Sequence, residues 1–172
     1  MIHTETTAGP AGRLTDAVRR LDGALAALPA ALPLLALRCA LAVPFFRSGL
    51  TKWDGPFELS AGARYLFTEE FGLHLFGAAI PYPAPLAMAY GAAIGEILLP
   101  VLLVLGLGTR FAAAGILAMT AVIQLTVPEG WANFHLPWAA MALTLLVFGG
   151  GGLGLDRAIG LGAPVRARLP LA

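Results

Sequence analysis

The chain has 172 residues, of which 58% are hydrophobic and only 12% are charged, and its net charge is +1 at pH 7. Soluble domains carry roughly 25% charged residues, so this chain has too few to cover a surface that faces water, and much of it must face lipid. The small net charge excludes an electrostatic footprint for nucleic acid, so no nucleic-acid partner is expected.

Residues 1–30 are expected to form an N-terminal tail and an amphipathic helix outside the membrane domain. Apolar side chains recur at spacings of four and three, which places them on one face of a helix, at Leu14, Val18, Leu21, Leu25 and Leu28. Arg19 and Arg20 lie off that face. An apolar stripe beside basic residues is typical of a helix that lies on a membrane surface.

Four apolar runs then predict four transmembrane helices, over roughly residues 31–51, 84–106, 110–127 and 134–150. A span needs about 20 residues, so the last two are short or begin in the interface. A tight turn at residues 106–109 separates the second span from the third, and the glycines at residues 149–152 end the fourth. The predicted fold class is therefore all-α: an integral membrane four-helix bundle over residues 31–160, followed by a cytoplasmic tail over residues 161–172.

The connection between the first and second spans is long and is expected to be partly helical. Residues 57–80 mix charged and apolar side chains, which favours a partly buried amphipathic helix that caps the outer end of the bundle. Three closely spaced prolines, Pro81, Pro83 and Pro85, end this segment before the second span.

The distribution of basic residues predicts the orientation. Seven arginines fall on one side of a four-span bundle, namely Arg13, Arg19, Arg20, Arg110, Arg157, Arg166 and Arg168. The other side has only Lys52 and Arg64 among basic residues. Because cytoplasmic loops carry the excess of Lys and Arg, we predict a multi-pass protein of the bacterial inner membrane with both termini in the cytoplasm.

Three ionisable residues inside the predicted spans form a candidate intramembrane polar site: Arg38, Arg47 and Glu96. A charge at the centre of a span costs at least about 2.5–3.5 kcal/mol, so an ion pair between the first and second spans is expected. Nine residues place the two arginines on opposite helical faces, so only one should face Glu96 unless Pro44 changes the phase. The group is either a structural ion pair or a site for an anionic or quinone-like ligand.

A candidate outer-entrance site comprises Lys52, Asn133 and His135, with Trp131 and Trp138 close to the histidine in sequence. A lone histidine at an interface more often donates a hydrogen bond than binds a ligand. Both interpretations stay open at this point.

An ion pair and a glycine motif are expected to hold the helices together. Arg110 opens the third span and Asp156 follows the fourth, both at the inner surface, so we predict a structural ion pair between them. Gly91 and Gly95 form a GxxxG step beside Glu96, which favours close packing of the second span against a neighbour.

The cysteine and histidine content of the chain disfavours haem and metal cofactors, whereas a bound quinone is still possible. The single cysteine, Cys39, excludes an intramolecular disulfide, a CxxC redox pair and a cysteine-based zinc site. A b-type haem normally needs two axial ligands from spanning helices, whereas His3 and His74 lie in the tail and the outer loop. No His/Asp/Glu cluster has the spacing of a metal site, so no metal is expected.

Several motifs together resemble the DoxX family of small four-helix bacterial membrane proteins. They are the opening helix with Leu37-Arg38 and Phe45-Phe46-Arg47-Ser48-Gly49-Leu50-Thr51-Lys52, then Gly95-Glu96 with Leu105-Gly106-Leu107-Gly108-Thr109-Arg110, then Gly152-Leu153-Gly154-Leu155-Asp156-Arg157. Their order and spacing over residues 34–160 carry the resemblance. The segment from Trp131 to Trp138 is similar to a subset of the family that has a W…H…W pattern before the fourth helix.

The resemblance implies a four-helix membrane fold and a role beside redox enzymes. The family takes its name from a subunit of a quinol or thiosulfate:quinone oxidoreductase, so the chain is expected to be an accessory membrane subunit of a quinone-linked or redox-stress system. A redox partner protein or a second copy of the chain would then bind it. The alternative is a non-enzymatic small-solute transporter or a membrane assembly protein, and whether the chain is an enzyme stays open.

Overall fold

The computed structural model describes residues 10–160 and divides the chain into two units between residues 30 and 31. The first unit contains helix α1 (Pro10–Ala26). The apolar residues Leu14, Val18, Leu21 and Leu25 of the predicted stripe lie in α1, and Leu28 follows it; all five are 57–68% exposed. The expected tail at residues 161–172 and the first nine residues of the N-terminal tail lie outside the described residues.

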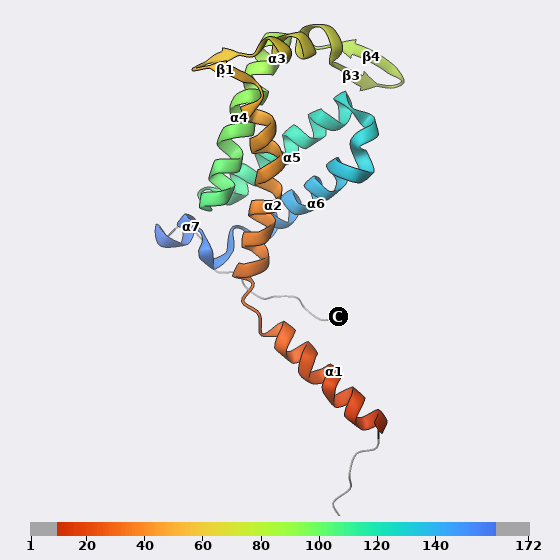
Figure 1. Ribbon diagram of the computed structural model, residues 1–172, viewed down its shortest axis with the longest axis vertical. Coiled ribbons are helices and arrows are strands. Elements are labelled where there is room, and N and C mark those ends of the chain that lie inside the picture. Colours follow the sequence, from red (N-terminus) through yellow and green to blue (C-terminus); the bar gives the residue numbers. More distant parts are fainter. Residues whose placement is uncertain (1–9, 161–172) are drawn as a thin grey trace, which may run out of the picture. The chain divides into compact units, whose positions relative to one another are not determined.

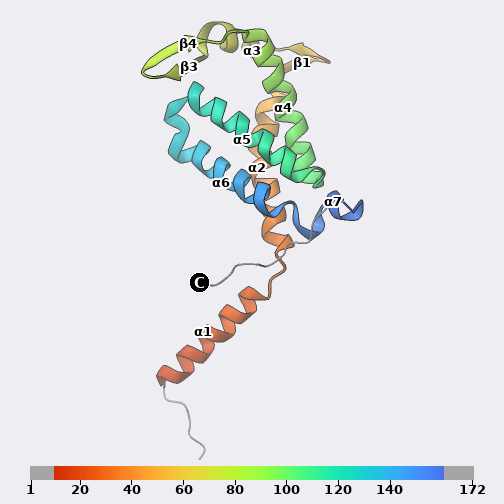
Figure 2. The same ribbon diagram turned by 180° about the vertical axis from the view of Figure 1, so that it is seen from behind.

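The second unit is built from helices that are long and apolar enough to cross a membrane. These segments are α2 (Ala31–Leu50), α4 (Pro85–Leu105), α5 (Thr109–Thr126) and the run Pro128–Phe148, which ends in α6 (Leu136–Phe148). The first eight residues of that last run form a 3-10 turn, Pro128–Gly130, and a π turn, Trp131–His135. In both views α2 lies beside α4, and α5 lies beside α6 (Figures 1 and 2). The predicted all-α membrane fold is confirmed.

The turns between the long helices use glycine in conformations that other residues rarely adopt. Gly106 ends α4 with φ 68°, and Gly108 precedes α5 with φ 57°. A Cβ on Gly106 would lie 2.5 Å from Cα of Gly154, so the α4–α5 turn packs directly on the segment that follows α6. That segment contains a 3-10 turn, Gly151–Leu153, and a short helix, α7 (Leu155–Ala158). We call this end of the bundle the tail end.

The core lies between the four long helices. Its fully buried side chains include Leu41 of α2, Leu103 of α4, Ile116 of α5 and Leu145 of α6. Lipid chains are as apolar as leucine, so such a core is stabilised mainly by close packing and not by exclusion of water. Many large apolar side chains on the same helices are exposed, as expected for surfaces that face lipid.

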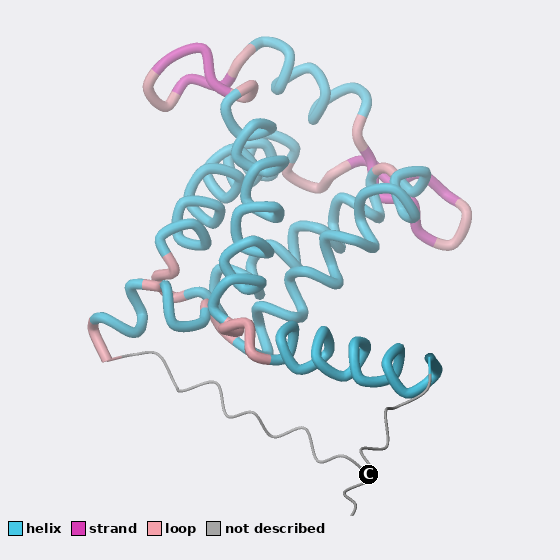
Figure 3. Tube along the Cα trace, turned by 60° about the horizontal axis from the view of Figure 1, so that its bottom comes forward, coloured by secondary structure: helices cyan, strands magenta, loops and turns pink. Residues whose placement is uncertain are grey.

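Residues 53–84, which precede α4, cover the opposite end of the bundle, and we call them the cap. The expected single helix over residues 57–80 is wrong: helical turns occupy only α3 (Ala61–Tyr65) and the π turn Leu66–Glu70. Antiparallel hairpins flank them, formed by β1 (Trp53–Gly55) with β2 (Glu58–Leu59) and by β3 (Gly72–Leu75) with β4 (Ala78–Pro81) (Figure 3).

Local backbone chemistry explains the second hairpin. The turn between β3 and β4 consists of Phe76 and Gly77, both with positive φ, which is the geometry of a two-residue hairpin turn. A Cβ on Gly72 would lie 2.9 Å from the carbonyl oxygen of Ile80, so only glycine allows the two strands to pair here. The backbone at Gly72, Phe76 and Gly77 therefore forms a hairpin, where the spacing of the apolar residues predicts a helix.

Candidate functional site

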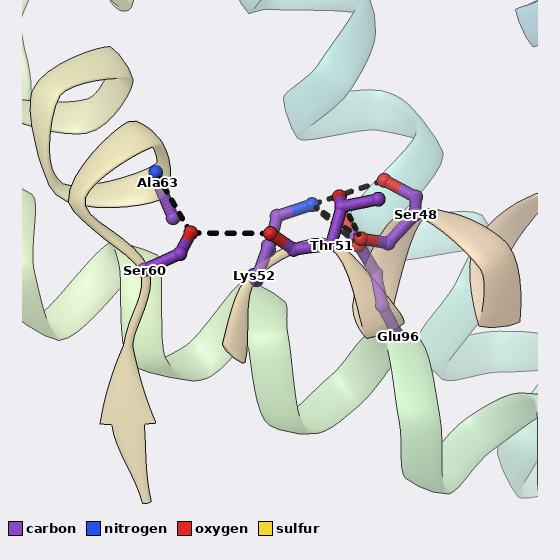
Figure 4. Close-up of polar contacts among 6 residues, drawn as sticks. All are labelled: Ser48, Thr51, Lys52, Ser60, Ala63 and Glu96. Carbon is purple, nitrogen blue, oxygen red and sulfur yellow. Dashed lines mark hydrogen bonds and ion pairs between the residues drawn. The ribbon is translucent and has the colours of Figure 1, made fainter. Parts of the chain in front are cut away.

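Glu96, midway along α4, forms an ion pair with Lys52, which follows the last turn of α2. Lys52 Nζ lies 2.6 Å from Glu96 Oε2, and the two side chains are 14% and 6% exposed. Lys52 Nζ also donates to Ser48 Oγ at 3.0 Å and lies 3.5 Å from the Ser48 carbonyl oxygen (Figure 4). Within residues 10–160 this is the one ion pair, so a pair of buried charges does link the first two spans.

The expectation that Arg38 or Arg47 pairs with Glu96 is wrong, and helix geometry gives the reason. A Cβ on Gly49 would lie 3.0 Å from Glu96 Cβ, so α2 passes α4 at the level of Gly49. Arg38 lies eleven residues earlier, about 16 Å away along the helix axis. Arg47 is near the correct level but is exposed, on a different face of α2 from Gly49. Lys52 is one turn beyond Ser48 and can reach back.

Hydrogen bonds from the cap hold the turn that carries Lys52. The backbone N–H of Ser60 donates to the Lys52 carbonyl oxygen at 2.9 Å, and Ser60 Oγ donates to the Thr51 carbonyl oxygen at 3.1 Å. Ser60 Oγ also accepts from the Ala63 N–H, which caps the N-terminus of α3 (Figure 4). Because one serine serves both the helix cap and this turn, the position of Lys52 depends on the fold of the cap.

The ion pair lies on the wall of a cavity of about 460 Å³ between α4, α5 and the cap. The lining is mostly apolar and includes aromatic and methionine side chains, among them Phe67, Phe71, Met88, Met119 and Trp138. Ser48, Lys52 and Glu96 form one polar group in the lining, and Tyr82 with Thr126 forms a second. An apolar chamber with a few convergent polar groups is the usual form of a small-molecule site.

Hydrogen-bond accounting shows which polar atoms of the cavity are free to bind a ligand. Thr126 Oγ1 donates its one hydrogen to the Val122 carbonyl oxygen at 2.9 Å, so Tyr82 must donate in the 2.5 Å contact between their hydroxyls. The Tyr82 oxygen therefore keeps only acceptor capacity. Glu96 uses Oε2 for Lys52, and Oε1 has no partner among the described residues. Both polar groups of the cavity thus offer a free acceptor.

Arg38 serves a different structure at the tail end, where it is 1% exposed. Its Nε and Nη2 donate to the carbonyl oxygens of Leu103 and Val104 at 2.6 and 2.5 Å. Its Nη1 donates to those of Gly150 and Leu153 at 3.0 and 3.2 Å. The guanidinium fork adds donors to carbonyls in the last turn of α4, of which Leu103 also accepts the N–H of Gly106, and it joins α4 to the segment after α6.

Asp156 also binds backbone at the tail end, and the predicted ion pair with Arg110 is absent from the described structure. Its carboxylate accepts the N–H groups of Gly108 and Thr109 at 2.7 and 3.0 Å, which caps the N-terminus of α5. Burial alone would raise the pKa of Asp156, but these two hydrogen bonds and the charge of Arg38 together hold it below its ordinary value. A helix N-terminus stabilises a carboxylate, because the N–H groups of its first turn have no partner within the helix.

The predicted outer-entrance residues do not come together. Lys52 lies in the cavity, whereas Asn133 is exposed. His135 is 3% exposed, and its Nδ1 lies 2.6 Å from Gln124 Oε1. The His135 ring packs on Trp138, with ring centroids 5.5 Å apart, so it supports a wall residue of the cavity without lining the cavity itself.

Sequence reasoning missed several residues of the site: Ser48, Tyr82, Gln124 and Thr126. The spacing of four between Ser48 and Lys52 was a readable signal, because such residues are neighbours on a helix. No local signal pointed to Tyr82 and Thr126, which lie 44 residues apart. Of the GxxxG pair, Gly95 packs against Met119 as expected, whereas Gly91 has open space beside it and lines the cavity.

Comparison with known proteins shows the family of the chain. The sequence model of the DoxX family matches residues 33–129, which is more than half of the chain and includes both Lys52 and Glu96. Asp156 lies beyond the matched region. No curated protein and no solved structure matches the chain. With its four apolar helices, the chain is a multi-pass membrane protein, and it belongs to the DoxX family.

Proposed function

We propose that the cavity beside Lys52 and Glu96 binds a quinone-class ligand, and that the chain acts as an accessory membrane subunit of a quinone-linked or redox-stress oxidoreductase. The observation that carries the proposal is the position of the ion pair. A pair that only stabilises a bundle needs no cavity, yet this pair borders a chamber of about 460 Å³ lined mainly by apolar side chains.

The free acceptors indicate which form of such a ligand binds more tightly. Glu96 Oε1 and the Tyr82 oxygen can accept hydrogen bonds but cannot donate them in this arrangement. A quinol presents two hydroxyl donors, whereas a quinone presents two carbonyl acceptors. A quinol satisfies both free acceptors, whereas a quinone would leave these oxygens without a partner and could accept only from a donor such as the Ser48 hydroxyl. We therefore expect tighter binding of the quinol.

The redox centre is assigned to a partner protein. Within residues 10–160, no group of three or more His, Cys, Asp or Glu side chains could hold a metal ion, and Cys39 is the one cysteine of the chain. A dithiol relay would need a second cysteine. In this proposal the chain holds and orients the lipid-soluble ligand while the partner transfers electrons.

The alternative of a solute transporter receives less support. Transport needs a polar path to both sides of the membrane. The bundle beyond Glu96 is instead closed by buried leucine and isoleucine side chains and by Arg38, whose three nitrogens each donate to backbone carbonyls. An assembly role remains the outcome to be expected if purified protein carries partners but no ligand.

The proposal is tested by purifying the chain in mild detergent and measuring bound quinone and quinol by extraction and mass spectrometry. Wild-type protein should retain the ligand, and Glu96→Gln and Lys52→Met should each lose most of it. Arg47→Gln is the matched control, because it removes an exposed charge from α2 outside this cavity. Equal ligand content in all four proteins, or none in the wild type with added quinol, would contradict the proposal.

A further inference from the structure

The cavity lies in a wedge between two diverging helices. α4 and α5 approach most closely where glycines face side chains: a Cβ on Gly95 would lie 3.0 Å from Met119 Sδ, and one on Gly115 would lie 2.9 Å from Leu99 Cδ1. From this crossing the helices separate toward the cap, as Figures 1 and 2 show. The lining residues of both helices lie at the crossing or on its cap side, over residues 87–96 and 118–126.

Small exposed side chains form the edges of the wedge. Ala87 and Gly91 of α4 and Ala118 and Val122 of α5 line the cavity and are exposed, whereas Glu96 behind them is buried. These four residues belong to segments that are apolar enough to span a membrane. In a bilayer, the opening between them faces lipid chains and not water.

The cap closes the same cavity toward its end of the bundle. Phe67 and Tyr82 are 7% and 6% exposed, and their rings stack with centroids 5.7 Å apart. The Tyr82 hydroxyl binds Thr126 of α5, and His74 Nδ1 lies 3.2 Å from the Leu125 carbonyl oxygen. The cap is thus attached to α5 by polar contacts at its end of the chamber, whereas the exposed residues between α4 and α5 lie at the side of the chamber.

We propose that the gap between α4 and α5 is a lateral portal, through which a lipid-dissolved amphiphile moves from the bilayer and places its polar head at Lys52 and Glu96. The portal rests on the proposed function in that it serves the same cavity, but its geometry does not depend on the ligand being a quinone. The aromatic and methionine lining accepts the apolar body, and the buried ion pair with its free carboxylate oxygen binds the hydroxyl-bearing head.

Fluorescence quenching by brominated phospholipid tests the portal directly. Trp138 lines the cavity, so a Trp53→Phe, Trp131→Phe background leaves one reporter inside it. In vesicles of brominated lipid, chains that enter the portal should quench Trp138. Ala118→Phe should remove more than half of this quenching, because the ring fills the edge of the opening.

Matched variants separate the portal from nonspecific effects. Ala114→Phe makes the same change one turn away on α5, at an exposed position outside the cavity, and should leave quenching unchanged. Gly91→Leu is a second plug that should fold normally, because nothing lies within 4 Å of a Cβ there. Equal quenching in plugged and control variants, or none in the background protein, overturns the portal.

The two proposals fail in different ways. If Trp138 is quenched and the plugs prevent it while no quinol binds, the portal stands and the quinone assignment fails. If long-chain quinol in vesicles binds wild type and the Ala118→Phe variant at the same rate, the cavity is a quinol site but the lateral portal is wrong. Slower binding to Ala118→Phe and Gly91→Leu than to Ala114→Phe supports both.

Discussion

The two ends of the bundle contain buried charges that are used in opposite ways. At the tail end, the three guanidinium nitrogens of Arg38 donate hydrogen bonds to backbone carbonyl oxygens, and the carboxylate of Asp156 accepts hydrogen bonds from backbone N–H groups. At the cap end, Lys52 and Glu96 bind each other beside a cavity, and one carboxylate oxygen has no partner in the described structure. A buried charge whose capacity is filled by backbone is structural, whereas one that faces open space with unused capacity can bind a ligand.

The largest loss of stability is expected for Arg38→Met. The change leaves the carbonyls of Leu103, Val104, Gly150 and Leu153 without this donor in a buried region, at about 1–3 kcal/mol for each that finds no other partner. Arg38→Lys should recover only part, because one ammonium cannot reproduce the fork. Thermal unfolding in detergent measures both variants. If Arg38→Met is as stable as wild type, the tail end does not depend on this network.

Glu96→Gln should lower the free energy of unfolding by about 3 kcal/mol, because it leaves Lys52 as an uncompensated buried charge. Adding Lys52→Met to the same variant should recover part of that loss, whereas adding Arg38→Met should lower stability further. The double-mutant cycle between positions 52 and 96 gives the coupling. If the coupling free energy between Glu96 and Arg47 is as large as that between Glu96 and Lys52, the assignment of Lys52 as the partner of Glu96 is wrong.

Asp156→Asn should have a smaller effect, about 1 kcal/mol, because it weakens one helix cap and its interaction with the helix dipole. The folded state lowers the pKa of Asp156 from 3.8, so this stabilisation is fully present above pH 3.8 and is lost as the pH falls through the lower, folded pKa. Stability measured against pH should therefore differ between wild type and variant at neutral pH and converge in strong acid.

Arg110→Gln should change stability least, by no more than a few tenths of a kcal/mol, because surface charges without an ordered partner contribute little. A double-mutant cycle with Asp156→Asn should show no coupling, since the described structure pairs Asp156 with backbone N–H groups. A clear coupling between positions 110 and 156 would restore the ion pair that the sequence predicts.

The orientation of the two ends can be examined without any change in stability. Single cysteines at positions 64 and 157, in a variant lacking Cys39, place one label in the cap and one at the tail end. The excess of arginine near the tail end predicts that only position 64 reacts with an impermeant reagent added outside intact cells. Labelling of position 157 alone would reverse the proposed topology and place the cap in the cytoplasm.

The sequence by itself determined the membrane fold. Low charge, four apolar runs and the glycine-containing breaks at residues 106–109 and 149–152 were enough to predict four spans, because a bilayer imposes length and apolarity on each span separately. The same local logic located the amphipathic helix α1 and predicted that Glu96 would need a cationic partner.

Only the tertiary structure decided which charges meet. The choice of Lys52 over Arg38 and Arg47 depends on the level at which α2 passes α4, which is set by the contact of Gly49 with Glu96. The cavity likewise depends on where α4 and α5 cross and on a cap that folds into hairpins instead of one helix. Contacts between residues tens of positions apart depend on helix stagger and crossing, and neither quantity is encoded in local spacing.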